Sequence, residues 1–141
     1  MIALIIGTHG EFSRELIESS KMIFGEQENI SYITFKPGEG PEELTLKYKN
    51  ELSKLNTKDG VLFLVDLFGG SPFNAASVMA LGDDKMEVVS GVNLPMLLEV
   101  FGSRSFSNLE ELVNVAVTVG KESIKSFKNG IEKDDDLEED L

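Results

Sequence analysis

Short, mainly apolar runs alternate along the chain with segments whose apolar residues recur every three or four positions. The runs are short enough, and rich enough in β-branched and aromatic residues, to be strands buried on both faces. They cover residues 2–6, 30–35, 60–65 and 86–90. The periodic segments predict helices, and they cover residues 12–24, 41–55, 72–81, 96–101 and 108–120. Strands alternating with helices predict a parallel α/β sheet, with right-handed crossovers and helices on both faces.

Residues typical of helix ends support these boundaries. Gly25 stands where a C-terminal cap is expected, and Pro41 stands at the start of a helix. Ser71 is predicted as an N-cap and Pro72 as the first helical residue after it. The segment around Ile124 and Phe127 is ambiguous, because it can extend the last helix or begin a short edge strand.

Four or five parallel strands favour the open, doubly wound, flavodoxin-like order 2-1-3-4, in which the first strand lies between the second and the third. Ligands of such folds bind beyond the carboxyl ends of the strands, where the strand order reverses. His9 follows the first strand and Asp66 follows the third. The topology therefore predicts that these two residues meet, although 57 positions separate them.

The length and the apolar content indicate the kind of protein. A chain of 141 residues with 41% apolar residues can form one domain with a substantial core. The sequence has no apolar stretch near 18 residues and no basic segment before the first apolar run, so we expect neither a membrane span nor a secretory signal. A cytoplasmic protein is the expectation.

Charge and the rarer residue types exclude several function classes. The chain has no cysteine and one histidine, so metal clusters built on these residues are excluded, and we expect no metal and no cofactor. A net charge of −12 disfavours binding to nucleic acid or to anionic membranes. The last ten residues hold seven acids and one base. We therefore expect residues 130–141 to be an acidic, disordered tail outside the folded part.

The two loops at the predicted switch point carry residues suited to phosphoryl transfer. A histidine is available as a neutral nucleophile near pH 7, and a carboxylate such as Asp66 can orient its ring by holding one ring proton. Gly69 and Gly70 let the backbone approach an anion closely, and Ser71 begins a helix whose N–H groups favour negative charge. We interpret His9 and Asp66 as catalytic, and Gly70 and Ser71 as phosphate-binding.

Each of these residues also has an ordinary structural explanation. A single loop histidine is usually a surface or capping residue, and an aspartate or a glycine pair followed by Ser-Pro is common in turns. Two other functions remain open from the residues alone. One is a serine hydrolase built on Ser71, His9 and Asp66, although the second glycine of a G-x-S-x-G elbow is missing. The other is a non-catalytic module that binds a phosphorylated metabolite.

Three motifs in order give the chain a family resemblance. They are "LIIGTHGEFS" at the N-terminus, "GVLFLVDLFGGSPFNAA" at 60–76 and "SGVNLPMLLE" at 90–99. Together they resemble the mannose-family enzyme IIA domain of the bacterial phosphoenolpyruvate-dependent sugar phosphotransferase system (PTS). The resemblance covers residues 1–129. It implies a domain of that extent and, because the chain stops after the acidic tail, a stand-alone IIA.

The resemblance also implies a role for each site residue. His9 would receive a phosphoryl group on Nε2 from the phosphocarrier protein HPr and pass it to a cognate enzyme IIB. Asp66 falls on the aspartate that pairs with the histidine ring, and Gly70 and Ser71 fall on the phosphate-binding turn. For Asn93 and Pro95, a turn that shapes the pocket wall is the favoured interpretation. The phosphocarrier subunit of a dihydroxyacetone kinase system shares this chemistry and is the nearest alternative.

The resemblance has consequences for assembly as well. The family is homodimeric, with a C-terminal antiparallel edge strand exchanged between subunits, and "SIKSFK" at 123–128 matches that strand by position. The membrane sugar permease, IIC and IID, would be an indirect partner, so the protein could lie at the inner face of the membrane.

Overall fold

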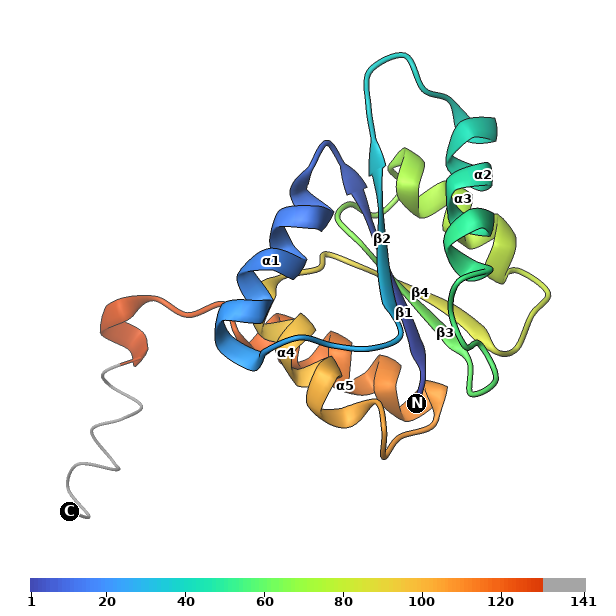
Figure 1. Cartoon of the computed structure of the whole chain (residues 1–141). Coiled ribbons are helices and arrows are strands. Elements are labelled where there is room, and N and C mark those ends of the chain that lie inside the picture. Colours follow the sequence, from blue (N-terminus) through green and yellow to red (C-terminus); the bar gives the residue numbers. More distant parts are fainter. Residues whose placement is uncertain (131–141) are drawn as a thin grey trace.

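The computed structural model describes residues 1–130, which form a four-stranded parallel sheet with helices on both faces (Figure 1). The strands are β1 (Ala3–His9), β2 (Ile30–Phe35), β3 (Val61–Val65) and β4 (Met86–Ser90). Every neighbouring pair is parallel, and the order is β2-β1-β3-β4. The predicted order of the four strands is therefore confirmed, and the order reverses between β1 and β3.

Five helices cover the two faces of the sheet. One face carries α1 (Phe12–Phe24), α4 (Leu94–Ser103) and α5 (Leu109–Glu122), and the other carries α2 (Pro41–Leu52) and α3 (Ser71–Ala80) (Figure 1). Because helices cover both faces of the central strands, neither face of these strands meets solvent. This explains why β1 and β3 are almost uniformly apolar.

Alternating residues of the strands supply two separate cores. In β1, Leu4 and Ile6 pack in the core beneath α1, α4 and α5, whereas Ala3 and Ile5 pack in the core beneath α2 and α3. His9 shares the parity of Ala3 and Ile5, and β1 carries it to the carboxyl edge of the sheet. The buried strand β1 thus determines where His9 lies at the edge of the sheet.

All five predicted helices are present, and their boundaries differ from the sequence pattern by one to three residues. Only α1 matches at both ends; α2 ends at Leu52 rather than at 55, and α4 covers Leu94–Ser103 rather than 96–101. Gly25 is the C-cap of α1, and Pro41 is the first residue of α2. The prediction of Ser71 as N-cap is wrong by one position, because Gly70 is the N-cap and Ser71 is already helical. The carbonyl of Gly70 accepts the helical hydrogen bond from the N–H of Asn74 (2.9 Å), and the Ser71 hydroxyl makes no capping bond.

The C-terminal segment lies apart from the sheet in the single chain. After α5, residues 124–126 have no regular structure and residues 127–130 form a helical turn, so the described residues contain no fifth strand. Ile124 and Phe127 are each 81% exposed. The expected acidic tail falls almost wholly on residues 131–141, which lie outside the described part. Within residues 1–130, no helix is long and apolar enough to cross a membrane.

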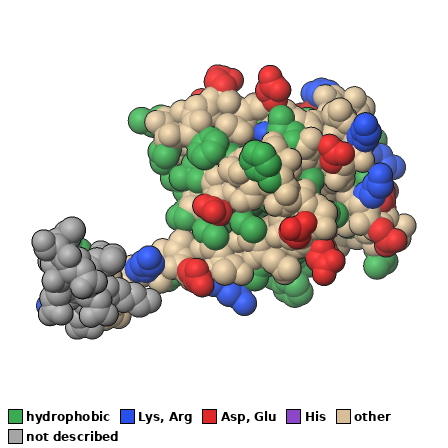
Figure 2. Space-filling view, turned by 90° about the horizontal axis from the view of Figure 1, so that it is seen from below, with side chains coloured by type: hydrophobic (Ala, Val, Ile, Leu, Met, Phe, Trp, Pro, Cys, Tyr) green, Lys and Arg blue, Asp and Glu red, His purple; other side chains and the backbone are tan. Residues whose placement is uncertain are grey.

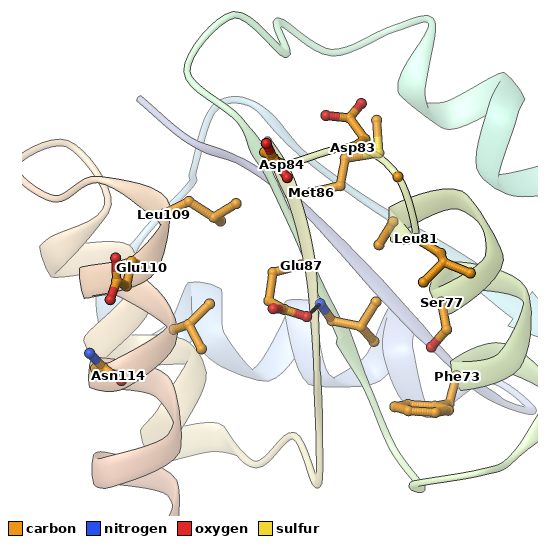
Figure 3. Close-up of a pocket in the computed structure, with 14 residues that line it drawn as sticks. Phe73, Ser77, Leu81, Asp83, Asp84, Met86, Glu87, Leu109, Glu110 and Asn114 are labelled. Carbon is orange, nitrogen blue, oxygen red and sulfur yellow. Dashed lines mark hydrogen bonds between the residues drawn. The ribbon is translucent and has the colours of Figure 1, made fainter.

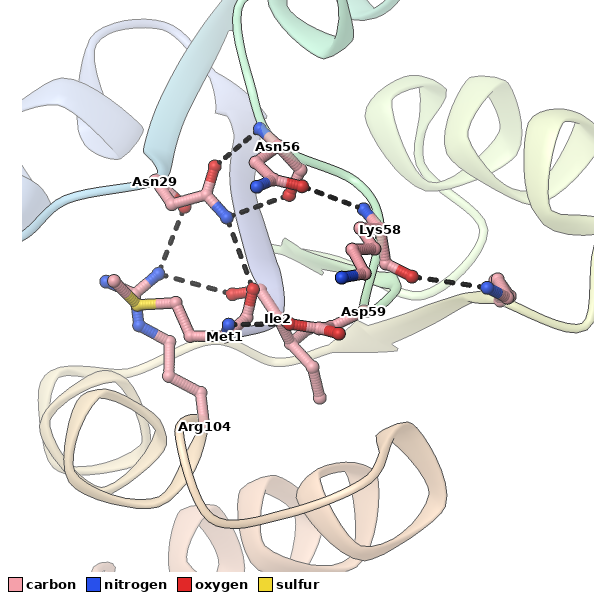
Figure 4. A network of polar contacts seen from close by, with 8 residues as sticks. Met1, Ile2, Asn29, Asn56, Lys58, Asp59 and Arg104 are labelled. Atoms are coloured by element: carbon pink, nitrogen blue, oxygen red, sulfur yellow. Dashed lines mark hydrogen bonds and ion pairs between the residues drawn. The ribbon is translucent and has the colours of Figure 1, made fainter.

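A buried arginine fastens the opposite end of the sheet, where the strands begin (Figure 4). The side chain of Arg104 is 1% exposed and donates to four acceptors around the starts of β1 and β2. These acceptors are the carbonyl oxygens of Ile2, Glu28 and Asn29 and the side-chain oxygen of Gln27.

The surface at this end of the sheet carries both kinds of charge. Lysine and arginine side chains gather toward one edge of the molecule, with acidic side chains beside them (Figure 2).

Candidate functional site

His9 ends β1 at a sharp turn. It lies opposite Phe35 in the register of β1 with β2, and the N–H of the next residue, Gly10, donates to the Phe35 carbonyl (2.8 Å). Gly10 has φ +56°, a left-handed conformation that favours glycine. The chain therefore turns away immediately after His9, and the imidazole is left at the rim of the sheet.

Two buried hydroxyl side chains hold this turn in place. The Oγ1 of Thr8 accepts a hydrogen bond from the N–H of Ser13 (2.7 Å), and the Ser13 hydroxyl donates to the Ile33 carbonyl (2.7 Å). Thr8 and Ser13 are fully buried, so these bonds form away from competing water. They fix the first turn of α1 against β1 and β2.

The carboxylate of Asp66 binds His9 at two points. Its Oδ2 accepts from the backbone N–H of His9 (2.9 Å) and lies 2.9 Å from the ring Nδ1. Because an ionised carboxylate only accepts, Nδ1 is the protonated ring nitrogen and Nε2 keeps its lone pair. The His9 side chain is 46% exposed and that of Asp66 is 17% exposed. The ring is therefore held on one side and open to an incoming group on the other.

Aromatic contact further limits the orientation of the imidazole. The Phe35 ring meets the His9 ring edge to face, with centroids 5.4 Å apart and an angle of 79° between the planes. With Asp66 on Nδ1, this contact leaves the ring one favoured orientation.

The second carboxylate oxygen of Asp66, Oδ1, is buried. Oδ1 has no hydrogen-bond partner among residues 1–130. Burial raises the pKa of the Tyr48 hydroxyl, and the negative charge of Asp66 raises it further. Tyr48 is therefore protonated throughout the physiological range and acts as a hydrogen-bond donor.

The turn before α3 lies directly beside the imidazole. A Cβ atom added to Gly70 would stand 3.0 Å from Cε1 of His9, so this position has no room for a side chain unless the ring moves. Gly69 has φ +80°, and its carbonyl accepts from the Asn74 side chain (3.1 Å). The Ser71 hydroxyl makes no hydrogen bond within the described part of the chain. The turn thus presents a free hydroxyl and a helix N-terminus next to His9.

Comparisons with known proteins agree with this geometry. The family model described as the PTS system fructose IIA component, of the EIIA-man type, matches residues 3–117. The chain belongs to the mannose-type enzyme IIA family of the sugar phosphotransferase system.

Individual relatives are similar to this chain over most of its length. The mannose-specific EIIAB component of Escherichia coli K12 is 48% identical over 128 residues, which are 90% of this chain and 40% of that protein. This chain therefore spans less than half the length of that relative. The fructose-specific EIIA component of Bacillus subtilis is 42% identical over 133 residues, 94% of this chain and 91% of that protein.

A solved structure shows the same fold. The phosphotransferase system component EIIA from Streptococcus agalactiae has a TM-score of 0.82 and 34% identity, covering 91% of this chain and 98% of that one. The α/β fold and its strand order are thus those of known enzyme IIA structures.

All four site residues predicted from the sequence of this enzyme IIA lie around one point. His9 and Asp66 are in contact, Gly70 adjoins the His9 ring, and Ser71 follows Gly70. The residues predicted for the site did not include Thr8, Ser13, Phe35 or Tyr48. Phe35 could have been found from the predicted order, since it ends the strand beside β1.

Apolar side chains are exposed after both strands of the site. Phe12, the first residue of α1, is 46% exposed, and Leu67 and Phe68, on the loop after β3, are 59% and 76% exposed. The centroids of the Phe68 and Phe73 rings lie 4.5 Å apart.

The geometry does not favour the hydrolase alternative. Within residues 1–130, His9 and Ser71 share no hydrogen bond, whereas a catalytic serine needs the imidazole as its base. The same residues contain no group of three or more acidic or histidine side chains placed to hold a metal ion.

Proposed function

We propose that this protein carries phosphoryl groups on His9, accepting them from phospho-HPr and donating them to a cognate enzyme IIB for sugar uptake. The observation that carries the proposal is the Nδ1 contact with Asp66 at 2.9 Å, which leaves Nε2 as the nucleophile beside the Gly70–Ser71 turn. The family membership supports the same chemistry.

In the proposed step, the Nε2 lone pair of neutral His9 attacks the phosphorus of phospho-HPr in line. A P–N bond to His9 forms while the P–N bond to the HPr histidine breaks, and the electron pair of the broken bond returns to the HPr ring. The His9 ring gains positive character, which the carboxylate of Asp66 stabilises through Nδ1–H. Transfer to enzyme IIB repeats this exchange, with His9 as the leaving group.

Gly70 and Ser71 have the complementary role of binding the transferred group. The Ser71 hydroxyl and the N–H groups at the start of α3 would donate to the equatorial oxygens of the phosphoryl group. The transition state of phosphoryl transfer is loose, so positioning and charge neutralisation provide most of the catalysis. Neither role requires a metal or a cofactor.

The partners follow from the place of an enzyme IIA in the phosphotransferase chain. HPr is the donor, enzyme IIB the acceptor, and the permease IIC and IID an indirect partner, which would bring the protein to the inner face of the membrane from the cytoplasm. Relatives named for mannose and for fructose share this domain. We infer that the sugar is selected by the other components.

The decisive experiment is phosphorylation of the purified protein by phosphoenolpyruvate, enzyme I and HPr. The wild-type protein is expected to take up acid-labile phosphate, and His9→Ala to take up none. Full labelling of His9→Ala would contradict the proposal. A chase with enzyme IIB in one arm and the dihydroxyacetone kinase subunits in another distinguishes the two phosphocarrier roles. Tight binding of a phosphorylated metabolite with no labelling would favour the binding module.

We propose further that the segment 123–128 of one subunit pairs with β4 of a second copy as an antiparallel edge strand. In the described chain β4 pairs only with β3, and a groove of about 570 Å³ runs along its open edge between α3 and α5 (Figure 3). Phe73 and Met86 line one side of this edge groove, and Leu109 and Val113 line the other. Ile124 and Phe127, three positions apart, would point to opposite faces of a strand and so enter both sides.

Charge supports the same occupant. The edge groove carries Asp83, Asp84, Glu87 and Glu110, and the segment carries Lys125 and Lys128. Glu87 is already engaged at the open edge, where its carboxylate accepts from the backbone N–H of Val88 (2.8 Å). A second copy therefore offers apolar side chains that match the apolar lining of the groove and basic side chains that match its acidic residues. The proposed domain spans residues 1–129, with residues 130–141 as a separate acidic tail.

A further inference from the structure

Tyr48 has a hydroxyl in an unusual place for a core residue. It lies in the apolar stripe of α2 and is 0% exposed, with its ring edge to face against Phe63 of β3 (centroids 5.2 Å apart, 90° between planes). Its hydroxyl donates to the carbonyl of Pro72 (2.9 Å). Pro72 directly follows Ser71, so this hydrogen bond ends on the first turn of α3, next to the proposed phosphate-binding residues.

The strand that carries His9 makes room for this hydroxyl. A Cβ atom at Gly7 would stand 2.1 Å from the Tyr48 oxygen and 3.0 Å from Cζ, a distance that no side chain could occupy. Gly7 is buried in β1, two residues before His9 and on the same side of the strand. A glycine inside a strand weakens it, which makes a close approach of another group the physical reason for its presence.

The Tyr48 side chain therefore contacts three of the segments that build the site. It touches β1 at Gly7, β3 at Phe63, and the start of α3 at Pro72. The charge of Asp66 also acts on it, as the raised pKa of Tyr48 indicates.

We propose that Tyr48 is a positioning residue for phosphoryl transfer, holding the Gly70–Ser71 turn at its working distance from His9 through the hydrogen bond to Pro72. It would touch neither the phosphoryl group nor the partner proteins. The proposal rests on the proposed function of His9. A buried tyrosine that merely satisfies its hydroxyl in the core is the competing explanation.

Tyr48→Phe is the direct test, because it removes one oxygen and keeps the ring. We expect single-turnover transfer from phospho-HPr to slow by about three- to tenfold, the effect of losing one neutral hydrogen bond. The Kd for HPr should stay unchanged, since Tyr48 is not on the surface. The matched control is Tyr32→Phe, on β2, whose hydroxyl has no hydrogen-bond partner among residues 1–130; it should transfer at the wild-type rate. A lower Tm for Tyr48→Phe with an unchanged transfer rate would overturn the proposal.

A measurement that does not depend on phosphorylation separates this inference from the proposed function. Amide hydrogen exchange at residues 70–74 should become faster in Tyr48→Phe, while exchange in β3 stays the same. Unchanged exchange at 70–74 would overturn the positioning role. Absence of labelling in the wild-type protein would instead contradict the function of His9 and leave the exchange result to decide whether Tyr48 fixes the turn.

Discussion

The Oδ2 atom of Asp66 accepts both the backbone N–H and the ring Nδ1–H of His9, each at 2.9 Å. One carboxylate oxygen thereby fixes the position of the main chain and the orientation of the ring at the same time. His9 ends β1 and Asp66 directly follows β3, and the carboxyl ends of these strands meet where the strand order reverses. The sheet thus positions the proposed nucleophile.

Asp66→Asn should keep the fold and slow phosphoryl transfer. The amide can still contact the ring, but it carries no charge to stabilise the imidazolium that forms. A hydrogen bond to a charged group contributes about 1.5–3 kcal/mol, which corresponds to a rate loss of roughly ten- to 150-fold. Rapid-quench measurement of transfer from phospho-HPr checks this. Transfer at the wild-type rate would assign Asp66 a structural role alone.

Gly70→Ala should impair transfer with little effect on stability. The backbone of Gly70 has φ −73°, which any residue can adopt, but the new methyl group would stand 3.0 Å from Cε1 of His9. We expect the ring to be displaced from Asp66 and the rate to fall at least about tenfold. Gly102→Ala is the control, because its methyl group would meet Phe24 at an ordinary 3.8 Å. Equal rates in the two variants would refute a role for close approach at Gly70.

Phe127→Glu should convert a dimer to a monomer. In the proposed exchange Phe127 enters the edge groove on β4, where a carboxylate would be buried near Glu87 and Glu110. Sedimentation equilibrium of the wild-type protein and the variant measures the change. Met22→Glu, on the exposed end of α1, is the matched control and should remain dimeric. A monomeric wild-type protein would contradict the exchange itself.

Arg104→Met should destabilise the protein without affecting the site chemistry. The substitution leaves the buried carbonyl of Ile2 without a donor and removes one of the two donors to the Asn29 carbonyl, which keeps the N–H of Leu4. A buried group without a partner costs about 1–3 kcal/mol, so we expect the free energy of unfolding to fall by about that amount, measured by urea denaturation. The chain has one other arginine, Arg14, which is exposed, so Arg14→Met should change stability little. A comparable loss in both variants would mean that the buried bonds of Arg104 contribute little.

The parts of the structure that follow from local pattern were predictable. Apolar runs specified the buried strands, and the rule for parallel sheets then brought His9 and Asp66 together. The misplaced N-cap at Ser71 has a local cause, because a serine and a glycine in succession can each begin a helix. A glycine fits at position 70 because its backbone lies close to the His9 ring. The sequence pattern does not show this contact, since the two residues are far apart in the chain.

The sequence did not indicate the contacts of residues that both pack in the interior and form specific hydrogen bonds. Tyr48 fits the apolar stripe of α2, a spacing that indicates only a core residue, although its hydroxyl reaches the start of α3. Thr8 and Ser13 are small polar residues whose bonds depend on the turn after β1. The proposed edge strand at 123–128 would involve a second copy, so neither periodicity nor a single chain determines it.

The hydrogen bond from Val88 to the carboxylate of Glu87 gives the open edge of the sheet a selectivity of its own. An unprotected edge strand can recruit any extended chain, which leads to aggregation. Here an incoming strand must displace Glu87 from the Val88 N–H and then compensate the released negative charge. A strand bearing lysines can do so, whereas a neutral or acidic strand would leave the carboxylate without a counterion. In the proposed exchange, the same side chain would disfavour neutral and acidic strands and favour the basic segment 123–128 of the chain itself.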